Sequence, residues 1–442
     1  MAETRTDRHQ PSRAAKAGRS SWLGKLGAGV ISGTANDDPS CIVTFSIAGA
    51  AFGYLTLWTS LYLLPVVGAV QLMSSRLGTV SGRGLAGTIR SAYSRRVLYP
   101  VCGALFLANV VTIGADLGAM AQVTEMITGV SGLIWTPIYA ALVVGLLFLL
   151  SYRRIESVLR WLCLVLFAYV AAGLLARPDW QEVLVATFVP QAEWSARYLA
   201  VIVAILGATV SPYFLFWQAI QEVEDEYARG RKSVRQRRRA TTVEGLDRSR
   251  LGVAAGAFVS KLITYAITLT TAATLFAHGR REIATAQDAA KALEPIAGPA
   301  ASWLFALGVI GTGMLAVPVL ACSSAYAVSE MRRWNASLEE SPKLAPKFYT
   351  VLLIATLLGV GLIYAGVPVV RMLFWASVLN GLLAPVAILL VVLLTRSREI
   401  MGEHVNPGWL TALGWASVAV TGAAAVAMLA SFAIAPEATA NP

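Results

Sequence analysis

Two short polar stretches interrupt the apolar runs of this chain, and both contain a proline. The first reads G-T-A-N-D-D-P-S-C and places Asp37 and Asp38 directly before Pro39. The second reads G-A-T-V-S-P-Y and places Ser211 directly before Pro212. Because proline lacks a backbone N–H and disfavours helix at the preceding residue, both stretches are predicted to unwind. Unwound backbone offers carbonyl oxygens to a cation and an aspartate adds a full negative charge, so we expect a cation site here.

A few further polar residues lie in apolar runs and could take part in this chemistry. Asp116 could relay an ion or a proton, or accept a hydrogen bond from the first break. Asn380 could line a cavity, or could only hold two helices together. Gln218 and Glu222 lie one turn apart on one helix face, which is typical of a polar helix end or of an inner exit path.

The groups that enzymatic or ATP-driven chemistry would need do not occur in a useful pattern. The three histidines, His9, His278 and His404, are all predicted to lie in tails or loops. The chain has no G-x-x-x-x-G-K-[ST] motif for binding the phosphates of ATP. We therefore predict that the protein is neither an enzyme nor a primary pump, and that it needs no cofactor.

The elements that must position these residues are membrane-spanning helices. Of 442 residues, 56% are hydrophobic and 14% are charged, and the mean hydropathy is +0.63. Soluble domains carry about 25% charged residues, so a soluble protein is excluded on composition. A spanning helix needs about 20 mostly apolar residues, and eleven runs qualify. They are 22–49, 52–74, 97–124, 135–151, 155–176, 198–224, 252–277, 299–328, 347–366, 371–394 and 408–434.

The net charge of +11 is explained by membrane topology. With the N-terminus inside the cell, most of the 36 Lys and Arg residues fall in segments predicted to be cytoplasmic, which include a basic tail at 1–21 and a basic loop at 225–251. Arg160 and Lys261 are expected within helices, near their cytoplasmic ends. We predict a multi-pass protein of the cell membrane that contacts the lipid bilayer and no nucleic acid, with its C-terminus outside. We expect it to act as a monomer.

The two breaks lie in the first and sixth predicted spans, five spans apart. This spacing is typical of two inverted five-helix repeats whose first helices are broken at the membrane midplane. We predict an all-α membrane protein with a leucine-transporter-type five-plus-five inverted repeat and broken helices 1 and 6. The first repeat covers 22–176 and the second covers 198–394, while 408–434 forms an eleventh helix.

The residues at the breaks resemble the motifs of the Nramp family of divalent-metal transporters. That family has D-P-G-N in helix 1, where this chain has Asp38-Pro39-Ser40-Cys41, and A-x-x-M-P-H in helix 6, where this chain has Ala208-Thr209-Val210-Ser211-Pro212-Tyr213. The resemblance implies a metal site formed by the set Asp38, Ala35, Cys41, Ala208 and Ser211. We further expect a supporting or pathway set of Asp37, Asp116, Tyr213, Thr209 and Asn380. Asp37 could equally be an inert, protonated residue, because two adjacent carboxylates do not readily ionise together.

Three departures from the family motifs predict a change of substrate. Ser211 replaces the family's methionine, which removes a soft ligand that favours transition metals. Tyr213 replaces a histidine, and Ala119 replaces the second acid of a helix 3 D-x-x-E motif, so two proton-carrying groups are lost. The chain thus resembles the Nramp-related magnesium transporters, which implies that it carries Mg²⁺, and also Mn²⁺, without tight proton coupling. Cys41 is the one softer group, and a buried neutral thiol is a poor ligand.

Two other functions remain compatible with the sequence. One is proton-coupled import of Mn²⁺ or Fe²⁺, which Asp38 and Asp116 could serve by themselves. The other is sodium-coupled transport of an organic solute on the same architecture, although the acidic N-D-D-P stretch opposes binding of a carboxylate.

Overall fold

The computed structural model describes residues 37–149, 164–294 and 298–434, and within these ranges the regular structure is helical, with no β-strand. The first half contains α2 (Pro39–Phe52), α3 (Trp58–Ser81), α4 (Leu85–Ala92), α5 (Arg95–Thr128), α6 (Gly132–Leu149), α8 (Phe167–Leu175) and α9 (Trp180–Phe188). The middle contains α10 (Ala196–Thr209), α11 (Pro212–Ala228), α12 (Val234–Arg239), α13 (Val243–Thr274) and α14 (Ala286–Ala290). The last part contains α16 (Ala301–Arg332), α17 (Pro346–Tyr364), α18 (Val369–Arg396), α19 (Arg398–Met401) and α20 (Gly408–Ile434).

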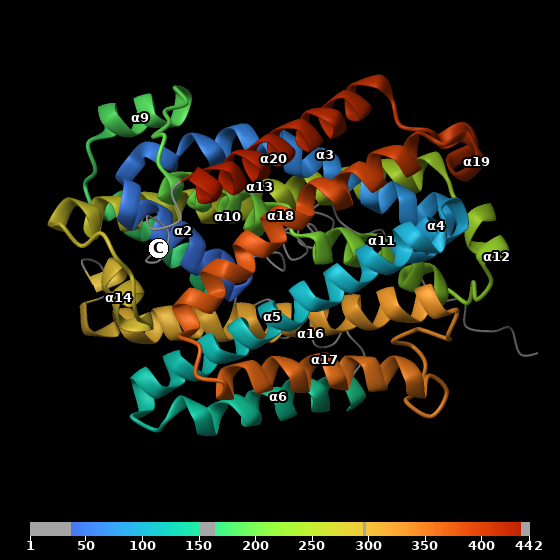
Figure 1. The fold of residues 1–442 in the computed structure, drawn as a ribbon, viewed down its shortest axis with the longest axis horizontal. Helices are drawn as coiled ribbons and strands as arrows, with labels where there is room; N and C mark the ends of the chain where they lie inside the picture. Colours follow the sequence, from blue (N-terminus) through green and yellow to red (C-terminus); the bar gives the residue numbers. More distant parts are fainter. Residues whose placement is uncertain (1–36, 150–163, 295–297, 435–442) are drawn as a thin grey trace, which may run out of the picture.

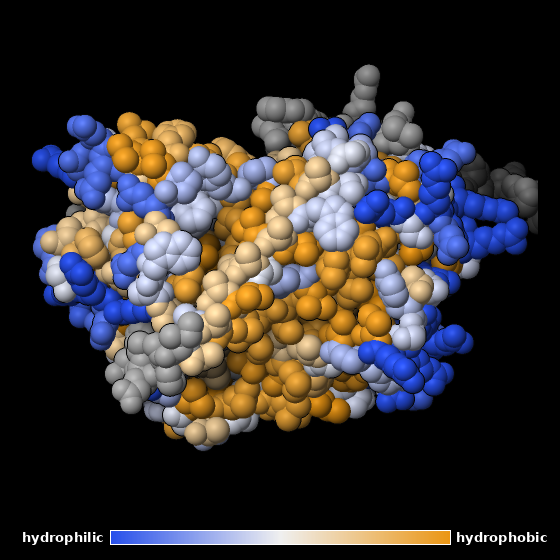
Figure 2. All heavy atoms as spheres, turned by 45° about the horizontal axis from the view of Figure 1, so that its top comes forward, coloured by the Kyte–Doolittle hydropathy of each residue, from blue (hydrophilic) through white to orange (hydrophobic). Residues whose placement is uncertain are grey.

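Ten helical segments of the described chain are long and apolar enough to cross a membrane. They match nine of the predicted spans by position. The first span, 22–49, and the fifth, 155–176, both begin outside the described residues, and their described parts lie in α2 and α8. The molecular surface agrees with a membrane setting, because a broad hydrophobic region separates hydrophilic side chains at the two ends (Figure 2). The all-α membrane class predicted from composition is confirmed.

The broken helices lie at the centre of the bundle. In the apolar stretch formed by α10 and α11, 89% of the residues are buried, and in the one that begins with α2, 83% are buried. In α20 only 22% of the residues of the apolar stretch are buried. The outer helices α6, α17 and α20 therefore present apolar side chains outward, where lipid would cover them. Burial of the helices that carry polar groups keeps those groups away from hydrocarbon.

Helices predicted to correspond in the two repeats pack against each other. The third helices of the repeats, α5 and α16, make the most extensive contact in the bundle. The second helices, α3 and α13, the fourth helices, α6 and α17, and the first helices, α2 and α10, also pack together. Contacts between counterparts are what a two-fold axis through the bundle centre produces, as the predicted inverted repeat requires.

Close packing at the centre depends on glycine. A Cβ at Gly207 of α10 would lie 2.0 Å from the carbonyl oxygen of Ser377, and one at Gly381 of α18 would lie 2.2 Å from that of Val203. Because backbone atoms cannot move aside as a side chain can, these glycines let α10 and α18 approach more closely than any larger residue would.

The short helices mark the two ends of the bundle. In Figure 1, α4, α12 and α19 lie at one end, named here the α12 end, and α9 and α14 lie at the other, named the α14 end. The segment 225–251, predicted as a basic loop, is helical over most of its length, because it contains the end of α11, all of α12 and the start of α13. Ser233 and Thr242 act as N-caps of the last two helices, which explains how a strongly basic segment starts helices there.

At the α12 end a single carboxylate joins α4 to α16. Glu330, in the last turn of α16, accepts hydrogen bonds of 2.8 Å from the backbone N–H groups of Gly84 and Gly87. These are two of the N–H groups that the first turn of α4 leaves without helical partners, and Arg90 of α4 donates to the carbonyl of Glu330 in return. The connection between α3 and α5 is thus fixed to the second repeat.

Candidate substrate site at the helix breaks

The first break ends at Asp38, which serves as the N-cap of α2. Its backbone is extended, and its Oδ1 accepts a 2.7 Å hydrogen bond from the backbone N–H of Cys41. Pro39 is the first helical residue, a position where its missing N–H removes no helical hydrogen bond. A helix start at Pro39 agrees with the break predicted at Asp38-Pro39, and the part of the predicted span before residue 37 lies outside the described residues. The expected carbonyl ligand Ala35 lies outside the described residues.

The second break separates α10 from α11. α10 ends at Thr209 and α11 begins at Pro212, as the sequence predicted. A helical carbonyl accepts from the N–H four residues later, and for Ala208 that residue is Pro212, which has none. The carbonyl of Ala208 therefore has no helical donor. The preceding carbonyl, that of Gly207, accepts instead from the hydroxyl of Ser211 at 2.8 Å.

A tyrosine holds the two breaks together. The hydroxyl of Tyr213, in the first turn of α11, donates to Oδ2 of Asp38 at 3.1 Å. Both residues are buried, so this is a bond between the two central helices with no water layer around it. The residue that stands where the Nramp motif has a histidine is thus in direct contact with the motif's aspartate.

Two further helices, α5 and α18, complete the surroundings of α2. The hydroxyl of Ser40 donates to Oδ1 of Asp116 at 2.9 Å, so Asp116 does accept a hydrogen bond from the first break. One turn earlier in α5, Thr112 accepts from the amide nitrogen of Asn380 at 3.2 Å. Ser377 of α18 accepts from the hydroxyl of Thr44 of α2 at 2.9 Å. Asp116 and Asn380 therefore lie in one polar layer with the break.

Asp37 faces the opposite side, toward α13. Its Oδ1 accepts from the hydroxyl of Ser260 at 2.6 Å, and the Cys41 thiol donates weakly to the same oxygen at 3.8 Å. The next residue of α13 is Lys261, whose ammonium donates to the hydroxyl of Thr209 at 2.8 Å and lies 5.0 Å from the ring centre of Phe45. Thr209 and Cys41 thus bind protein groups in this structure.

The expectation that Lys261 lies near a helix end was wrong. Its helix begins at Val243, well before the start of the predicted span at 252, so residue 261 lies deep in the bundle beside both breaks. Ser260, Lys261 and Ser377 are the site residues that the sequence analysis missed. Only Lys261 carried a signal, since a charged residue inside a predicted span is costly and points to a function.

Other residues considered from the sequence lie away from the breaks or serve packing. The carboxylate of Glu222 accepts from the hydroxyls of Ser75 and Ser249 at 2.6 and 3.1 Å, which joins α11 to α3 and α13. Gln218, one turn earlier in α11, is buried. Asn109 serves packing, because it donates from α5 to Ser323 and other acceptors on α16.

Several buried oxygens at the breaks accept no hydrogen bond from the described residues. Oδ2 of Asp37, Oδ2 of Asp116 and Oδ1 of Asn380 are buried and have no hydrogen-bond donor. Within the described ranges no group of three or more His, Cys, Asp and Glu side chains is arranged to hold a metal.

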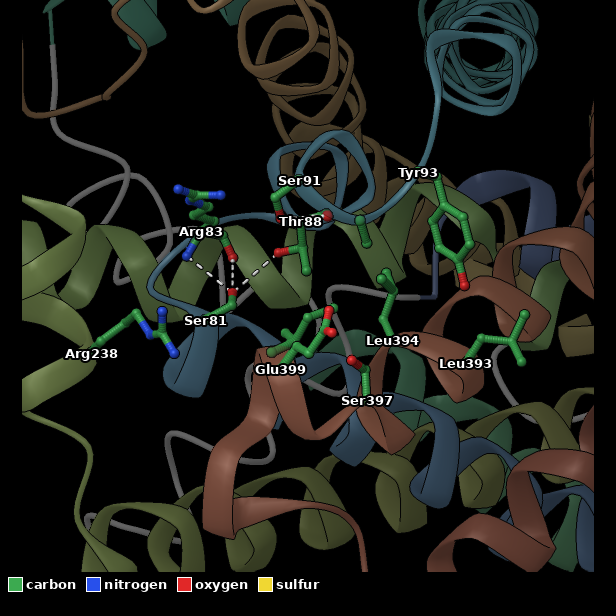
Figure 3. Close-up of a pocket in the computed structure, with 12 residues that line it drawn as sticks. Ser81, Arg83, Thr88, Ser91, Tyr93, Arg238, Leu393, Leu394, Ser397 and Glu399 are labelled. Atoms are coloured by element: carbon green, nitrogen blue, oxygen red, sulfur yellow. Dashed lines mark hydrogen bonds between the residues drawn. The ribbon is translucent and has the colours of Figure 1, made fainter.

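A polar pocket at the α12 end does not belong to this site. It has a volume of about 430 Å³, and Arg83, Arg238 and Glu399 are among the residues that line it (Figure 3). Its lining residues derive from the ends of α3 and α18, from α4, α12 and α19, and from the residues next to these helices. The site at the breaks is enclosed, since Asp37 and Asp38 are only 2% and 4% exposed.

With this geometry, comparison with known proteins identifies the family. The family model described as natural resistance-associated macrophage protein-like, Nramp, matches residues 29–431. The chain belongs to the Nramp family. One relative, the divalent metal cation transporter MntH of Klebsiella pneumoniae, is 25% identical over 92% of this chain and 93% of its own length. MntH of Verminephrobacter eiseniae is 28% identical over 94% of this chain and 91% of its own.

Solved structures share the fold. The manganese transporter of Eremococcus coleocola superposes with a TM-score of 0.74 at 20% identity, covering 97% of this chain and 91% of its own. MhsT in complex with L-phenylalanine gives a TM-score of 0.57 at 15% identity over 93% of this chain and 98% of its own. The predicted leucine-transporter-type fold is confirmed, and this Nramp chain is a multi-pass membrane transporter and not an enzyme.

Proposed function

We propose that this Nramp chain carries a divalent metal cation, Mg²⁺ and also Mn²⁺, across the membrane into the cytoplasm. Its relatives named above are divalent metal cation transporters, and the fold is shared with a manganese transporter. In this proposal the α12 end, with its basic segment, faces the cytoplasm, in keeping with the excess of positive residues on that side. The N-terminus would then be cytoplasmic and the C-terminus outside.

The observation that carries the proposal is the contact between the two breaks. The hydrogen bond from Tyr213 to Asp38 brings the start of α11 to the start of α2. On one side of this contact Asp38 supplies a carboxylate, and on the other Ala208 supplies a carbonyl without a helical donor and Ser211 a hydroxyl. Oxygen ligands from two broken helices, with one full negative charge, suit a cation that must bind and leave again. Ala35, at the first break, is expected to add a second carbonyl.

The type of ligand favours Mg²⁺ over softer metals. Mg²⁺ is a hard ion that keeps several of its waters and takes few protein ligands, whereas thioether and thiolate sulfur selects softer ions. Ser211 offers oxygen where the family has methionine sulfur. The thiol of Cys41, the one sulfur among the proposed ligands, donates toward Asp37, which is consistent with a neutral group that binds metals poorly.

Transport without tight proton coupling follows from the groups at the family's proton-carrying positions. Tyr213 and Ala119 cannot exchange protons as the family's histidine and glutamate can. A second candidate, proton-coupled Mn²⁺ uptake, is favoured by one observation, the buried carboxylate of Asp116 hydrogen-bonded to Ser40 at the first break. This carboxylate could carry a proton by itself, so proton movement has to be measured.

Transport by purified protein in liposomes tests both candidates. Entry of Mg²⁺, Mn²⁺ and Ca²⁺ is followed with a metal-sensitive dye inside, and a pH dye reports protons in parallel vesicles. We expect Mg²⁺ and Mn²⁺ entry with no internal acidification beyond that of empty liposomes. Acidification in step with Mn²⁺ entry would favour the proton-coupled importer, and absence of flux for every divalent ion would refute both.

Variants locate the site. Asp38→Asn removes the charge while keeping the shape, and we expect at least a tenfold loss of divalent uptake with little change in thermal stability. Glu193→Gln is the matched control, since it removes one carboxylate charge from an exposed position in the α9–α10 connection. Wild-type uptake by Asp38→Asn would exclude Asp38 as a ligand.

A further inference from the structure

All the buried charged side chains of the described chain meet at the two helix breaks. They are Asp37, Asp38, Asp116 and Lys261, each at most 4% exposed. A charge inside a membrane protein is costly unless it is paired or used, and four of them in one place point to a shared role. The function proposed above gives roles to the carboxylates and leaves Lys261 unexplained.

The ammonium of Lys261 is held by three central helices at once. It extends from α13, donates to Thr209 at the end of α10 and lies against the ring of Phe45 in α2. A cation over an aromatic face is stabilised by the ring's negative π-face. These contacts fix the positive charge beside the breaks although the side chain itself is flexible.

Asp37 is the carboxylate that binds α13, the helix that carries this charge. It accepts a 2.6 Å hydrogen bond from the hydroxyl of Ser260, the residue directly before Lys261 in α13. Its second oxygen has no hydrogen-bond donor. The other two buried carboxylates bind hydroxyl groups of other helices. Asp38 accepts from Tyr213 of α11, and Asp116 accepts from Ser40 of α2.

We propose that Lys261 is a built-in cation that balances Asp37, so that one divalent ion alone neutralises the site and no monovalent ion need accompany it. Three carboxylates and one ammonium leave a formal charge of −2, equal and opposite to that of Mg²⁺ or Mn²⁺. Lys261 is a positioning residue, because it acts through the charge of the site and not by touching the metal. This inference rests on the proposed function and explains the uncoupled transport in it.

Charge balance makes opposite predictions for the two members of the pair. Lys261→Gln leaves a charge of −3, so the KM for Mg²⁺ should fall at least tenfold, while maximal uptake should become dependent on a monovalent cation. Asp37→Asn leaves a charge of −1, so the KM should rise at least tenfold. The double variant restores −2, so its KM should return to within about threefold of wild type, the pattern expected of a coupled pair.

The experiment measures Mg²⁺ uptake into liposomes in NaCl and in choline chloride for the wild type, both single variants and the double variant. We expect equal wild-type uptake in the two salts, and at least tenfold higher uptake in NaCl than in choline chloride for Lys261→Gln. The surface pair Asp288 and Lys291, joined at 3.1 Å at the α14 end, is the matched control. Asp288→Asn and Lys291→Gln should leave the KM unchanged because water screens these charges.

The outcomes separate this inference from the function on which it rests. Wild-type protein that moves no divalent ion refutes the proposed function. If the wild type transports, a KM shifted in the same direction by both single variants overturns the charge balance, and so does a double variant as impaired as the worse single one. If Lys261→Gln does not fold, the charge balance is tested by comparing Asp37→Asn with the double variant. The double variant should fold and have a KM near that of wild type, and a KM as high as that of Asp37→Asn would overturn the charge balance.

Discussion

Whether the carbonyl of Ala208 binds the metal can be tested by introducing the backbone N–H that Pro212 lacks. Pro212→Ala introduces an N–H four residues after Ala208, which is the position of the normal helical donor. In the present structure α10 ends at Thr209 and α11 begins at Pro212, so the new N–H lies at the break itself. A metal that uses the Ala208 carbonyl would then compete with a backbone hydrogen bond.

The size of the effect follows from the strength of that bond. A backbone hydrogen bond contributes a net ~0.5–1.5 kcal/mol, and ~1.4 kcal/mol corresponds to a tenfold change in affinity, so Mg²⁺ should bind roughly two- to twelvefold more weakly. Stability should hardly change. Replacing proline costs ~0.4–1 kcal/mol through the unfolded chain, which opposes the gain from the new bond.

Isothermal titration of the detergent-solubilised protein with Mg²⁺ gives the affinity, thermal unfolding gives the stability, and uptake into liposomes gives the KM. Pro65→Ala is the matched control, because Pro65 also lies inside a helix, α3, but on the exposed surface of the bundle. The control should leave the affinity unchanged. An unaltered affinity in Pro212→Ala, with the protein folded, would refute the assignment of the Ala208 carbonyl as a ligand.

Three further variants test the packing and the polar contacts. Gly207→Ala places a Cβ 2.0 Å from the backbone of α18, so we expect loss of folding or of at least 90% of uptake. Gly361→Ala is the control, because its new Cβ has no atom within 4 Å, and it should behave as wild type in size-exclusion and uptake measurements. Glu330→Ala removes the acceptor of two backbone N–H groups of α4, and at ~1–3 kcal/mol for each buried group left without a partner it should lower the thermal midpoint clearly; an unchanged midpoint would contradict the proposed fixing of α4. Tyr213→Phe removes the donor that binds Asp38 in this structure, so Mg²⁺ should bind up to about tenfold more tightly with slower turnover. Weaker binding would show that the hydroxyl helps to hold the metal.

The helical class, the membrane setting and the two breaks could be predicted because each depends on local sequence. Apolar runs of about 20 residues have no stable state in a bilayer other than helix. Pro39 and Pro212 each remove one backbone donor, wherever the rest of the chain lies. Helix ends were less predictable, and the segment 225–251 proved largely helical because the caps Ser233 and Thr242 start helices that composition does not indicate.

Only some of the site residues could be predicted from the sequence. Asp38, Ala208, Ser211 and Tyr213 could be named because they stand next to the prolines. Ser260 and Ser377 could not, since hydroxyl residues are common in membrane helices and nothing local separates one that faces a carboxylate from one that faces its own helix.

The sequence by itself determined where the chain crosses the membrane, where two helices must break and which carboxylates lie at the breaks. Only the tertiary structure decided that Tyr213 contacts Asp38 and that Ser40 contacts Asp116. It also placed Lys261 against Thr209 at the second break, directly after the Ser260 that binds Asp37. The physical reason is the distance along the chain over which each effect acts. A missing N–H acts within four residues, whereas the partner of a buried charge is chosen by how helices far apart in the chain rotate and pack, and Lys261 reaches the breaks from more than two hundred residues after Asp37.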